Sequence, residues 1–281
     1  QIKISVSDEH LEADQVYAYL DLSPIGMETT CSAEGSHLLE VYARDIAGNE
    51  TVRRVRFTID RTAPTIPSLS TYPYSTNYSA TKTFRVSWTR ASDTLSGVSG
   101  YELWMKDGYS GTWKNLGLTT ATYRSITGSP GHTYYFRVRA RDRAGNYSNF
   151  STIKYTIVPY DQTSLSFSSG WTTYRSSSLY LSTSRASAYR YRYATFRATG
   201  AREITLIATK RPTSGYARIY VNNTLVKTVN LYSATTRVRQ PIVIKTYSSP
   251  RTVTVKIVVA RTKSSASKGY AVEIDGLAVR R

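Results

Sequence analysis

Cysteine is almost absent from this sequence. The 281 residues contain a single cysteine, Cys31, so the chain cannot form an internal disulfide or a cysteine-rich metal site. Three histidines leave little material for a histidine-based catalytic or metal cluster. No run approaches the roughly 18 consecutive apolar residues that a membrane-spanning helix needs. The chain begins at Gln1 without a signal-peptide pattern, so we interpret it as a mature form or an excised fragment.

Carboxylates are scarce in the second half of the chain. Residues 160–281 contain four of them, Asp161, Glu203, Glu273 and Asp275, whose spacing shows no acid/base pair of the kind that glycoside hydrolysis requires. The sequence also lacks a nucleophile elbow, a His-Glu-x-x-His motif and a phosphate-binding glycine loop. We therefore predict a non-catalytic chain with no metal site and no cofactor.

The abundant residues favour β-structure and an anionic partner. There are 24 tyrosines, and tyrosine suits half-buried, pleated surfaces. The formal net charge of +18 is unevenly divided, because residues 1–66 carry −5, residues 67–159 carry +7 and residues 160–281 carry +16. Repulsion among these cations lowers the stability of the last segment, so an anionic partner is expected there. A merely soluble basic surface is the alternative.

One stretch of sequence occurs twice. Segment 35–49, GSHLLEVYARDIAGN, is echoed about 95 residues further on by segment 131–146, GHTYYFRVRARDRAGN. In both copies apolar residues alternate along a strand, a turn with the pattern Asp-x-Ala-Gly-Asn follows, and a second strand returns. Both copies are therefore predicted β-hairpins. His37 and His132 occupy matching positions at the start of each copy, which indicates a structural role.

Residues 67–158 resemble a fibronectin type III domain. Val86-Ser87-Trp88-Thr89 matches the second-strand tryptophan of that family, and Gly100-Tyr101-Glu102-Leu103 matches its third strand. Pro130-Gly131-x-x-Tyr134 matches its tyrosine corner. The resemblance implies a β-sandwich over this whole segment.

Residues 1–66 resemble the C-terminal part of a bacterial immunoglobulin-like domain. The Ala-Arg-Asp-x-Ala-Gly-Asn hairpin and the linker 60–64, DRTAP, carry this resemblance. The segment is short for such a domain, which runs to roughly 80–100 residues. We expect that a first strand is missing, and that it is supplied either by sequence upstream of Gln1 or by another chain through strand addition.

Residues 159–281 show many short strands separated by Ser, Gly and Asn turns, which predicts a jelly-roll sandwich. This segment is similar to the jelly-roll, carbohydrate-binding-like modules of secreted bacterial hydrolases and surface proteins. The similar residues lie in 217–223, 228–233 and 272–279, although Asn222-Asn223 stands where that family often has Asp-Gly. The predicted fold is thus all-β, with three tandem sandwiches over 1–66, 67–158 and 159–281. The expected strands of the last sandwich are 193–199, 204–209, 217–221, 227–231, 238–244, 252–259 and 270–274.

The most distinctive segment of the last sandwich is 189–196, YRYRYATF. Read as a strand, it places Tyr189, Tyr191 and Tyr193 on one face and Ala194 and Phe196 on the other. Because a core needs the apolar pair inside, the tyrosines would face outward, where rings can stack on sugar faces. An ordinary exposed strand is the alternative. Our candidate carbohydrate-binding residues are these three tyrosines with Trp171 and Tyr174, and our candidate anion-binding residues are Arg190, Arg192, Lys210 and Arg211.

Three functions fit these patterns. The first is a non-catalytic, secreted or surface-displayed bacterial chain, or the tail of a secreted hydrolase, whose immunoglobulin-type spacers present a basic module to a polysaccharide or another anionic cell-wall or capsule polymer. The second is a structural subunit of a filament, sheath or surface layer, because the charge gradient would favour head-to-tail self-association. The third is nucleic-acid binding, which an extracellular type of domain series makes the least favoured.

Overall fold

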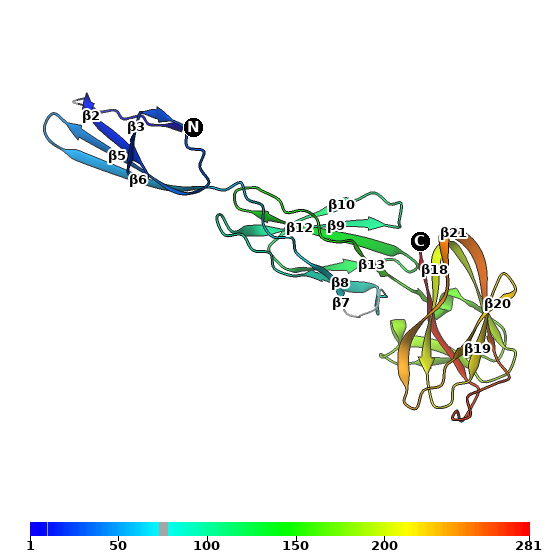
Figure 1. The fold of residues 1–281 in the computed structure, drawn as a ribbon. Coiled ribbons are helices and arrows are strands. Elements are labelled where there is room, and N and C mark those ends of the chain that lie inside the picture. The colour runs from blue at the N-terminus through cyan, green and yellow to red at the C-terminus, as the bar shows by residue number, and fades with distance from the viewer. Residues whose placement is uncertain (10, 73–77) are drawn as a thin grey trace.

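The structure is a computed structural model, and it describes residues 1–9, 11–72 and 78–281. Its regular elements are strands apart from two short 3₁₀ turns, η1 (Gln162–Ser164) and η2 (Tyr180–Ser182), so the predicted all-β class is confirmed. Three groups of sheets follow one another along the chain (Figure 1), and we call them the N-terminal, middle and C-terminal modules. Among the described residues, no helix has the length and hydropathy needed to cross a bilayer.

The N-terminal module contains a four-stranded antiparallel sheet in the order β3-β2-β5-β6 and a two-stranded ribbon, β1-β4. Residue-by-residue pairing of β5 with β6 confirms the first predicted hairpin. Its turn is closed by Asp45, whose Oδ1 accepts a 2.8 Å hydrogen bond from the backbone N–H of Asn49. The strands are β1 (Ile2–Lys3), β2 (Leu11–Leu20), β3 (Ser23–Ile25), β4 (Glu28–Thr29), β5 (Gly35–Asp45) and β6 (Glu50–Ile59).

The middle module is a sandwich of a three-stranded sheet, β11-β8-β7, and a four-stranded sheet, β10-β9-β12-β13. Its buried core includes Trp88, Phe136 and Val138. Ser129 donates its backbone N–H to the Tyr134 hydroxyl at 2.9 Å, as a tyrosine corner requires. The strands are β7 (Leu69–Tyr72), β8 (Thr83–Trp88), β9 (Val98–Asp107), β10 (Lys114–Thr119), β11 (Tyr123–Thr127), β12 (Thr133–Asp142) and β13 (Lys154–Ile157).

The second hairpin, β12-β13, repeats the local geometry of the first. Asp142 Oδ1 accepts a 2.8 Å hydrogen bond from the backbone N–H of Asn146, which is the counterpart of the turn in the N-terminal module. The matching histidines also behave alike, because His37 Nδ1 lies 2.7 Å from Asp21 Oδ2 and His132 Nδ1 lies 2.6 Å from Asp107 Oδ2. Each histidine thus ties the start of its hairpin to the end of the neighbouring strand.

The C-terminal module is built around two long strands. The sequence predicts separate strands over 193–199 and 204–209, and over 238–244 and 252–259; the structure joins each pair into one strand, β18 (18 residues) and β21 (23 residues). Register shifts between Ala198 and Glu203, with Gly200 at a φ of 66°, bend the pair without ending the ladder. The strands are β14 (Tyr160–Asp161), β15 (Ser166–Phe167), β16 (Thr172–Arg175), β17 (Thr183–Ser187), β18 (Tyr193–Lys210), β19 (Tyr216–Val221), β20 (Thr224–Asn230), β21 (Arg237–Val259) and β22 (Val272–Arg280).

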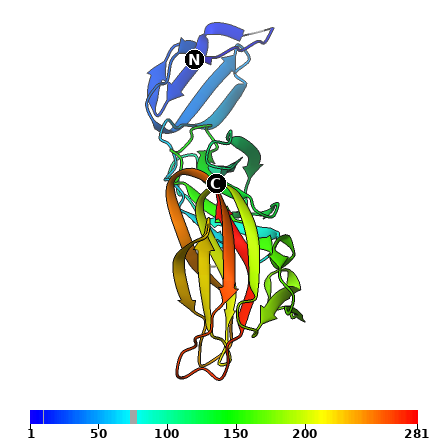
Figure 2. The same cartoon turned by 90° about the vertical axis from the view of Figure 1, so that its right-hand side faces the viewer.

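The bend divides the module into two layers that enclose its core. In the distal layer, residues 193–198 of β18 pair with β15 and with residues 253–258 of β21, which continue into β19 and β20. In the proximal layer, residues 203–210 of β18 pair with residues 237–246 of β21 and with β22, beside β17 and β16. Figure 2 views the module from its side away from the middle module, with β19 and β20 in yellow.

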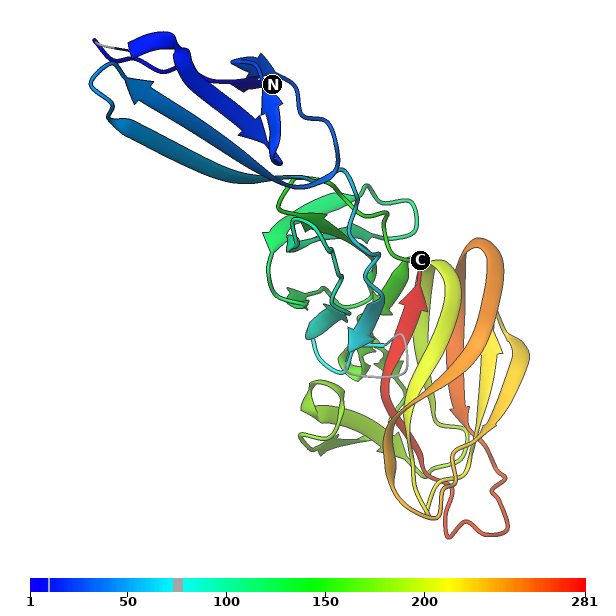
Figure 3. The same ribbon diagram turned by 60° about the vertical axis from the view of Figure 1, so that its left-hand side comes forward.

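The proximal layer packs against the middle module. Ile157 of β13 forms a buried cluster with Ile207 of β18 and Ala278 of β22. Tyr78 donates its hydroxyl hydrogen to Glu203 Oε1 at 2.9 Å, and Tyr135 donates to the backbone oxygen of Arg281 at 3.1 Å. The C terminus therefore lies beside the middle module, as Figures 1 and 3 show. The distal layer remains open on its outer side.

A buried carboxyl group lies at the bulge of β22. Asp275 is 0% exposed, and both of its oxygens accept the backbone N–H of Tyr180, at 2.9 and 3.1 Å. Burial raises the pKa of Asp275 from 3.8 to about 7. Between these two values the folded chain binds a proton that the unfolded chain has released, so the stability of the module falls as the pH rises.

We expect Asp275→Asn to remove this pH dependence. Over pH 4 to 8 the free energy of unfolding of the native module should fall by on the order of 4 kcal/mol relative to that of the variant, at 1.36 kcal/mol for each pKa unit. The amide oxygen of asparagine still accepts the Tyr180 N–H. Urea unfolding followed by tryptophan fluorescence at pH 4.5 and 7.5 measures the difference, in the transition that the variant shifts. Glu28→Gln, which removes a carboxylate with 65% side-chain exposure, is the control. Equal pH dependence in native chain and D275N would contradict the assignment.

Candidate functional site

The outer face of the distal layer gathers aromatic and cationic side chains. Ala194 is 0% exposed and Phe196 packs against the core, so alternation turns Tyr193 outward, as predicted. Tyr193 pairs across the ladder with Val258, which in turn pairs with Arg218 of β19. One ladder step along, Lys256 pairs with Tyr220. Residues that pair in this way point to the same side of a sheet.

Tyr191 joins this face from a turn rather than from a strand. The strand expected from residue 193 does begin there, because β18 starts at Tyr193, but the period-two reading of 189–196 fails for its first four residues, since residues 190 and 191 form a turn. Arg192 donates its backbone N–H to the Tyr189 oxygen, and Tyr191 adopts a φ of 66°. A left-handed residue ends the alternation, so the three tyrosines cannot form the row expected from a period of two.

Tyr191 lines a shallow hollow of about 360 Å³ with Tyr220, Asn223, Lys256 and Val258. Tyr191 is 61% exposed and Tyr193 is 39% exposed, so both rings are accessible to a ligand. Lys256 Nζ lies 4.4 Å from the centroid of the Tyr193 ring, and Arg261 lies 5.8 Å from that of Tyr191. We call the group Tyr191, Tyr193, Arg218, Tyr220, Asn223, Lys256 and Val258 the distal patch.

The structure brings two of the five candidate carbohydrate-binding residues into the distal patch. Tyr189 is 68% exposed but lies against Gly170, with ring atom Cδ2 3.3 Å from where a side chain on that glycine would begin. Tyr174 is exposed on β16, at the opposite end of the sheet order from β19 and β20. Trp171 packs against the core and Phe167, with ring centroids 4.9 Å apart, because a large apolar ring gains most from burial.

The candidate anion-binding residues divide in a similar way. Arg211 is held by the buried Glu273, with Nε 2.6 Å from Oε2, so its guanidinium already has a carboxylate. Arg192 donates to Ser169 Oγ at 2.9 Å, and Arg190 lies over the Tyr270 ring at 4.8 Å. Lys210 ends β18 in the proximal layer, away from the distal patch. The cations of the patch are instead Lys256 and Arg218, which the sequence analysis did not single out.

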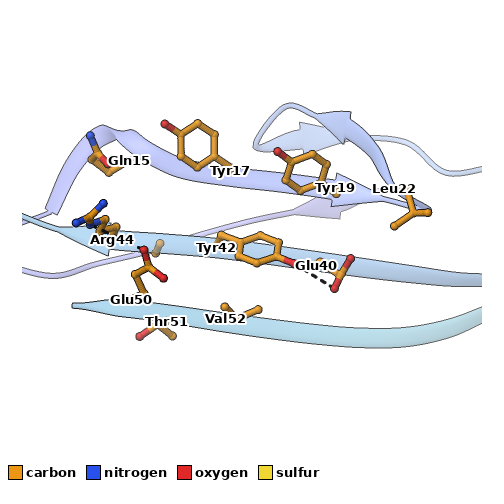
Figure 4. A pocket seen from close by; sticks show the side chains of 11 residues that line it. Gln15, Tyr17, Tyr19, Leu22, Glu40, Tyr42, Arg44, Glu50, Thr51 and Val52 are labelled. Atoms are coloured by element: carbon orange, nitrogen blue, oxygen red, sulfur yellow. Dashed lines mark hydrogen bonds and ion pairs between the residues drawn. The ribbon is translucent and has the colours of Figure 1, made fainter. Parts of the chain in front are cut away.

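A larger hollow, of about 570 Å³, lies on the N-terminal module. Figure 4 shows Tyr17, Tyr19 and Tyr42 projecting from one face of β2 and β5, with Val52 beside them on β6. Tyr19 and Tyr42 pack edge to face, with centroids 5.9 Å apart. Glu40, which accepts from the Tyr42 hydroxyl, is paired with Arg54 at 2.7 Å. The Glu40 carboxylate is thus paired within the module, whose net charge is −5.

Three carboxylates meet where the N-terminal and middle modules join. Oxygens of Asp60, Asp93 and Asp142 lie within 4.8 Å of one another. Each accepts backbone N–H groups: Asp60 from Ser96 at 3.0 Å, Asp93 from Gly97 at 2.7 Å and Asp142 from Gly145 at 2.6 Å. These hydrogen bonds account for the cluster as a set of turn caps that also fixes the linker, and Asn146 Nδ2 donates a 3.0 Å hydrogen bond to the backbone oxygen of Asp60.

Comparison with known proteins finds no matching family model. The chain is similar to endoglucanase B of Cellulomonas fimi, with 34% identity over 134 residues, which are 44% of this chain and 12% of the relative. It is also similar to exoglucanase B of the same organism, with 27% identity over 145 residues, 48% of this chain and 12% of the relative. The chain thus spans about an eighth of the length of these relatives.

Two solved structures are similar to this chain at low identity. Fibronectin(III)-like modules of CbhA from Clostridium thermocellum match 55% of this chain and 80% of their own, with 17% identity and a TM-score of 0.32. A carbohydrate-binding module of the β-sandwich superfamily matches 79% of this chain and 100% of its own, with 12% identity and a TM-score of 0.33.

The left-handed backbone conformation of Tyr191 predicts that replacing this residue by glycine stabilises the C-terminal module. An aromatic residue at positive φ carries strain that glycine does not. We expect Tyr191→Gly to stabilise the C-terminal module by about 1 kcal/mol while removing the ring. Tyr191→Ala removes the same ring without relieving the backbone, so it should give no stabilisation. Urea midpoints from tryptophan fluorescence compare the two variants, in the transition that the substitutions shift. Equal midpoints would show that the turn is not strained.

Proposed function

We propose that this chain is a non-catalytic, extracellular polysaccharide-binding segment whose C-terminal module binds its ligand at the distal patch. The N-terminal and middle modules, in this proposal, are immunoglobulin-type and fibronectin-type spacers. The observation that carries the proposal is the exposure of the Tyr191 and Tyr193 rings beside Lys256, on the side of the module that faces away from the middle module. Tyrosine rings stack on the apolar faces of sugars, and an ammonium group attracts carboxylate or sulfate substituents.

The carboxylates of the C-terminal module support a binding role rather than hydrolysis. Glu203 lies 3.5 Å from Arg280, and Glu273 holds Arg211 and accepts from Ser184. Asp275 accepts the backbone N–H of Tyr180, and Asp161 caps η1 through Thr163. All four therefore have internal partners, whereas glycoside hydrolysis needs two carboxyl groups that face the scissile bond.

The relatives supply a second line of support. The similarity to an endoglucanase and an exoglucanase covers a small part of those proteins, which fits a segment that accompanies a polysaccharide-degrading enzyme. Such a segment would act outside the cell on the same class of polymer. The net charge of +16 on residues 160–281 favours a glycan that carries negative charge.

We expect the double variant Tyr191→Ala/Tyr193→Ala to weaken polysaccharide binding at least tenfold, about 1.4 kcal/mol. Native affinity electrophoresis in gels that contain neutral β-glucan, neutral xylan, polygalacturonate or alginate measures the effect at roughly 20 mM salt, where charge is least screened. Lys256→Gln should weaken binding to the two acidic polymers and leave binding to the neutral ones unchanged.

Tyr123→Ala is the matched control, because Tyr123 is 44% exposed but belongs to the middle module. It should migrate like the native chain in every gel. If Y191A/Y193A is retarded as strongly as Y123A, the distal patch is not the binding site. If the native chain is not retarded in any gel, the proposed function itself is wrong.

A further inference from the structure

Cations and aromatic rings alternate along one face of the middle module. Phe150 lies between Arg137 and Arg139, whose guanidinium carbons are 4.0 and 5.0 Å from the ring centroid. Tyr147 lies between Arg139 and Arg141, at 3.9 and 5.5 Å. The stack therefore runs Arg141, Tyr147, Arg139, Phe150, Arg137. We call it, with its continuation below, the arginine ladder.

The ladder continues to the C-terminal module. Trp113 lies between Arg137, at 4.4 Å, and Lys106, at 5.3 Å. Tyr109 lies between Lys106, at 5.4 Å, and Arg202 of β18, at 4.5 Å. These five cations and four rings form one row that spans two modules, and two further rings, Trp104 and Tyr135, also lie near its cations.

Successive side chains of β12 point to opposite sides of the sheet, and this explains why its three arginines share the outer face. Phe136, Val138 and Ala140 are 0% exposed, so the intervening arginines point out of the sandwich. On β9, Trp104 stands opposite Arg137 and Glu102 opposite Arg139. Trp113, Tyr147 and Phe150 come from the segments 108–113 and 143–153, which connect the strands of this sheet and close the spaces between the guanidinium groups.

The ladder carries more positive charge than the structure neutralises. Among the described residues, Arg139 is its one member with a carboxylate partner, Glu102, at 2.8 Å. Arg141, Arg137, Lys106 and Arg202 leave about four positive charges in the row, and arginine stays protonated at any physiological pH. Burial and the neighbouring Arg139 lower the pKa of Arg137, which shows that cations are being held close together.

We propose that the arginine ladder is a second binding site, which takes the carboxylate or sulfate groups of a linear anionic polysaccharide. The residues along β12 repeat every two positions, so their cations recur at roughly 6.6 Å intervals, and a polymer with regularly spaced anions can bridge several of them. The planar guanidinium forks bind carboxylate and sulfate oxygens in pairs. The proposal is independent of the distal patch, because none of its residues belongs to that patch.

The cations beside every ring favour an anionic polysaccharide over a nucleic acid. Proteins that bind single strands stack bases on exposed aromatic faces. In the ladder, Phe150, Tyr147, Trp113 and Tyr109 each have two cations within about 5.5 Å of the ring centroid, although Tyr147 and Tyr109 keep 37% and 57% exposure. The row has more cations than rings, and its guanidinium groups without a carboxylate partner among the described residues suit an anionic group better than a base or a neutral sugar. A nucleic acid is therefore tested as the alternative ligand.

The test uses the full chain with Tyr191→Ala/Tyr193→Ala as background, so that binding at the distal patch does not contribute. Biolayer interferometry with immobilised heparin, which is sulfated, and polygalacturonate, which is carboxylated, measures Kd from 50 to 300 mM salt. We expect Arg137→Gln/Arg141→Gln to weaken binding at least tenfold at 100 mM salt. The slope of log K against log salt should also fall by about 1.5, the value for two lost ionic contacts.

Two further variants show whether a change in Kd comes from total charge, from the position of the ladder or from unfolding. Arg85→Gln/Arg90→Gln removes the same charge from exposed positions outside this sheet of the middle module and should change Kd less than about twofold. Glu102→Gln releases Arg139 and should tighten binding about threefold. Because E102Q moves the affinity upward, it keeps the test decisive even where R137Q/R141Q unfolds, which tryptophan fluorescence would reveal.

Binding to heparin but not polygalacturonate, or the reverse, identifies the anionic group and supports the site. The proposal is overturned if R137Q/R141Q and R85Q/R90Q weaken binding equally, because charge alone would then explain it. It is also overturned if E102Q leaves Kd unchanged, or if a single-stranded oligonucleotide binds more tightly than both polysaccharides. If Y191A/Y193A binds polysaccharide as tightly as the native chain, the proposed function fails, but the ladder proposal is unaffected.

Discussion

The pairing of β18 with β21 determines where every surface of the C-terminal module lies. Each strand runs through both layers, and the register shifts near Gly200 turn the pair from one layer into the other. On one side of that bend the outward residues include Ile207, which is 4% exposed and packs on the middle module; on the other side they include Tyr193 and Lys256. The continuous pairing of β18 with β21 thus both attaches the module to the middle module and orients the distal patch away from that contact.

Much of this arrangement follows from local patterns in the sequence. The repeated Asp-x-Ala-Gly-Asn turns correctly predict two hairpins, because the aspartate oxygen caps the backbone of the asparagine in both copies. The alternation of Ala194 and Phe196 correctly predicts which face of β18 is buried, since burying apolar surface is the main driving force for folding. The positive φ values at Asn222 and Asn223 fit a tight two-residue turn, which that pair favours.

Other features depend on contacts that no local pattern records. From the sequence alone, the bend in β18 looks the same as a loop between two strands, because a bulge and a turn both use glycine and small residues. Tyr191 breaks the period of two through its backbone conformation, which side-chain chemistry does not reveal. Lys256 and Tyr220 meet Tyr193 through the pairing of strands that are distant in sequence. The arginine ladder could be half inferred, since the apolar alternation of β12 places three arginines on the other face, but its rings arrive from connecting segments.

The two aromatic and cationic surfaces differ in what their rings can still do. In the distal patch, the Tyr191 and Tyr193 rings each have a single neighbouring cation among the described residues: Arg261 lies 5.8 Å from the Tyr191 ring and Lys256 lies 4.4 Å from the Tyr193 ring, and Tyr191 is 61% exposed. In the arginine ladder each ring has two cations near its centroid and helps to fix the guanidinium groups in place, while Tyr109 and Tyr147 keep 57% and 37% exposure. A cation held in this way loses little side-chain entropy when an anion arrives, because its rotamer is set before binding. The same two residue classes therefore form a surface suited to sugar faces in one module and a rigid row of anion-binding groups in the next.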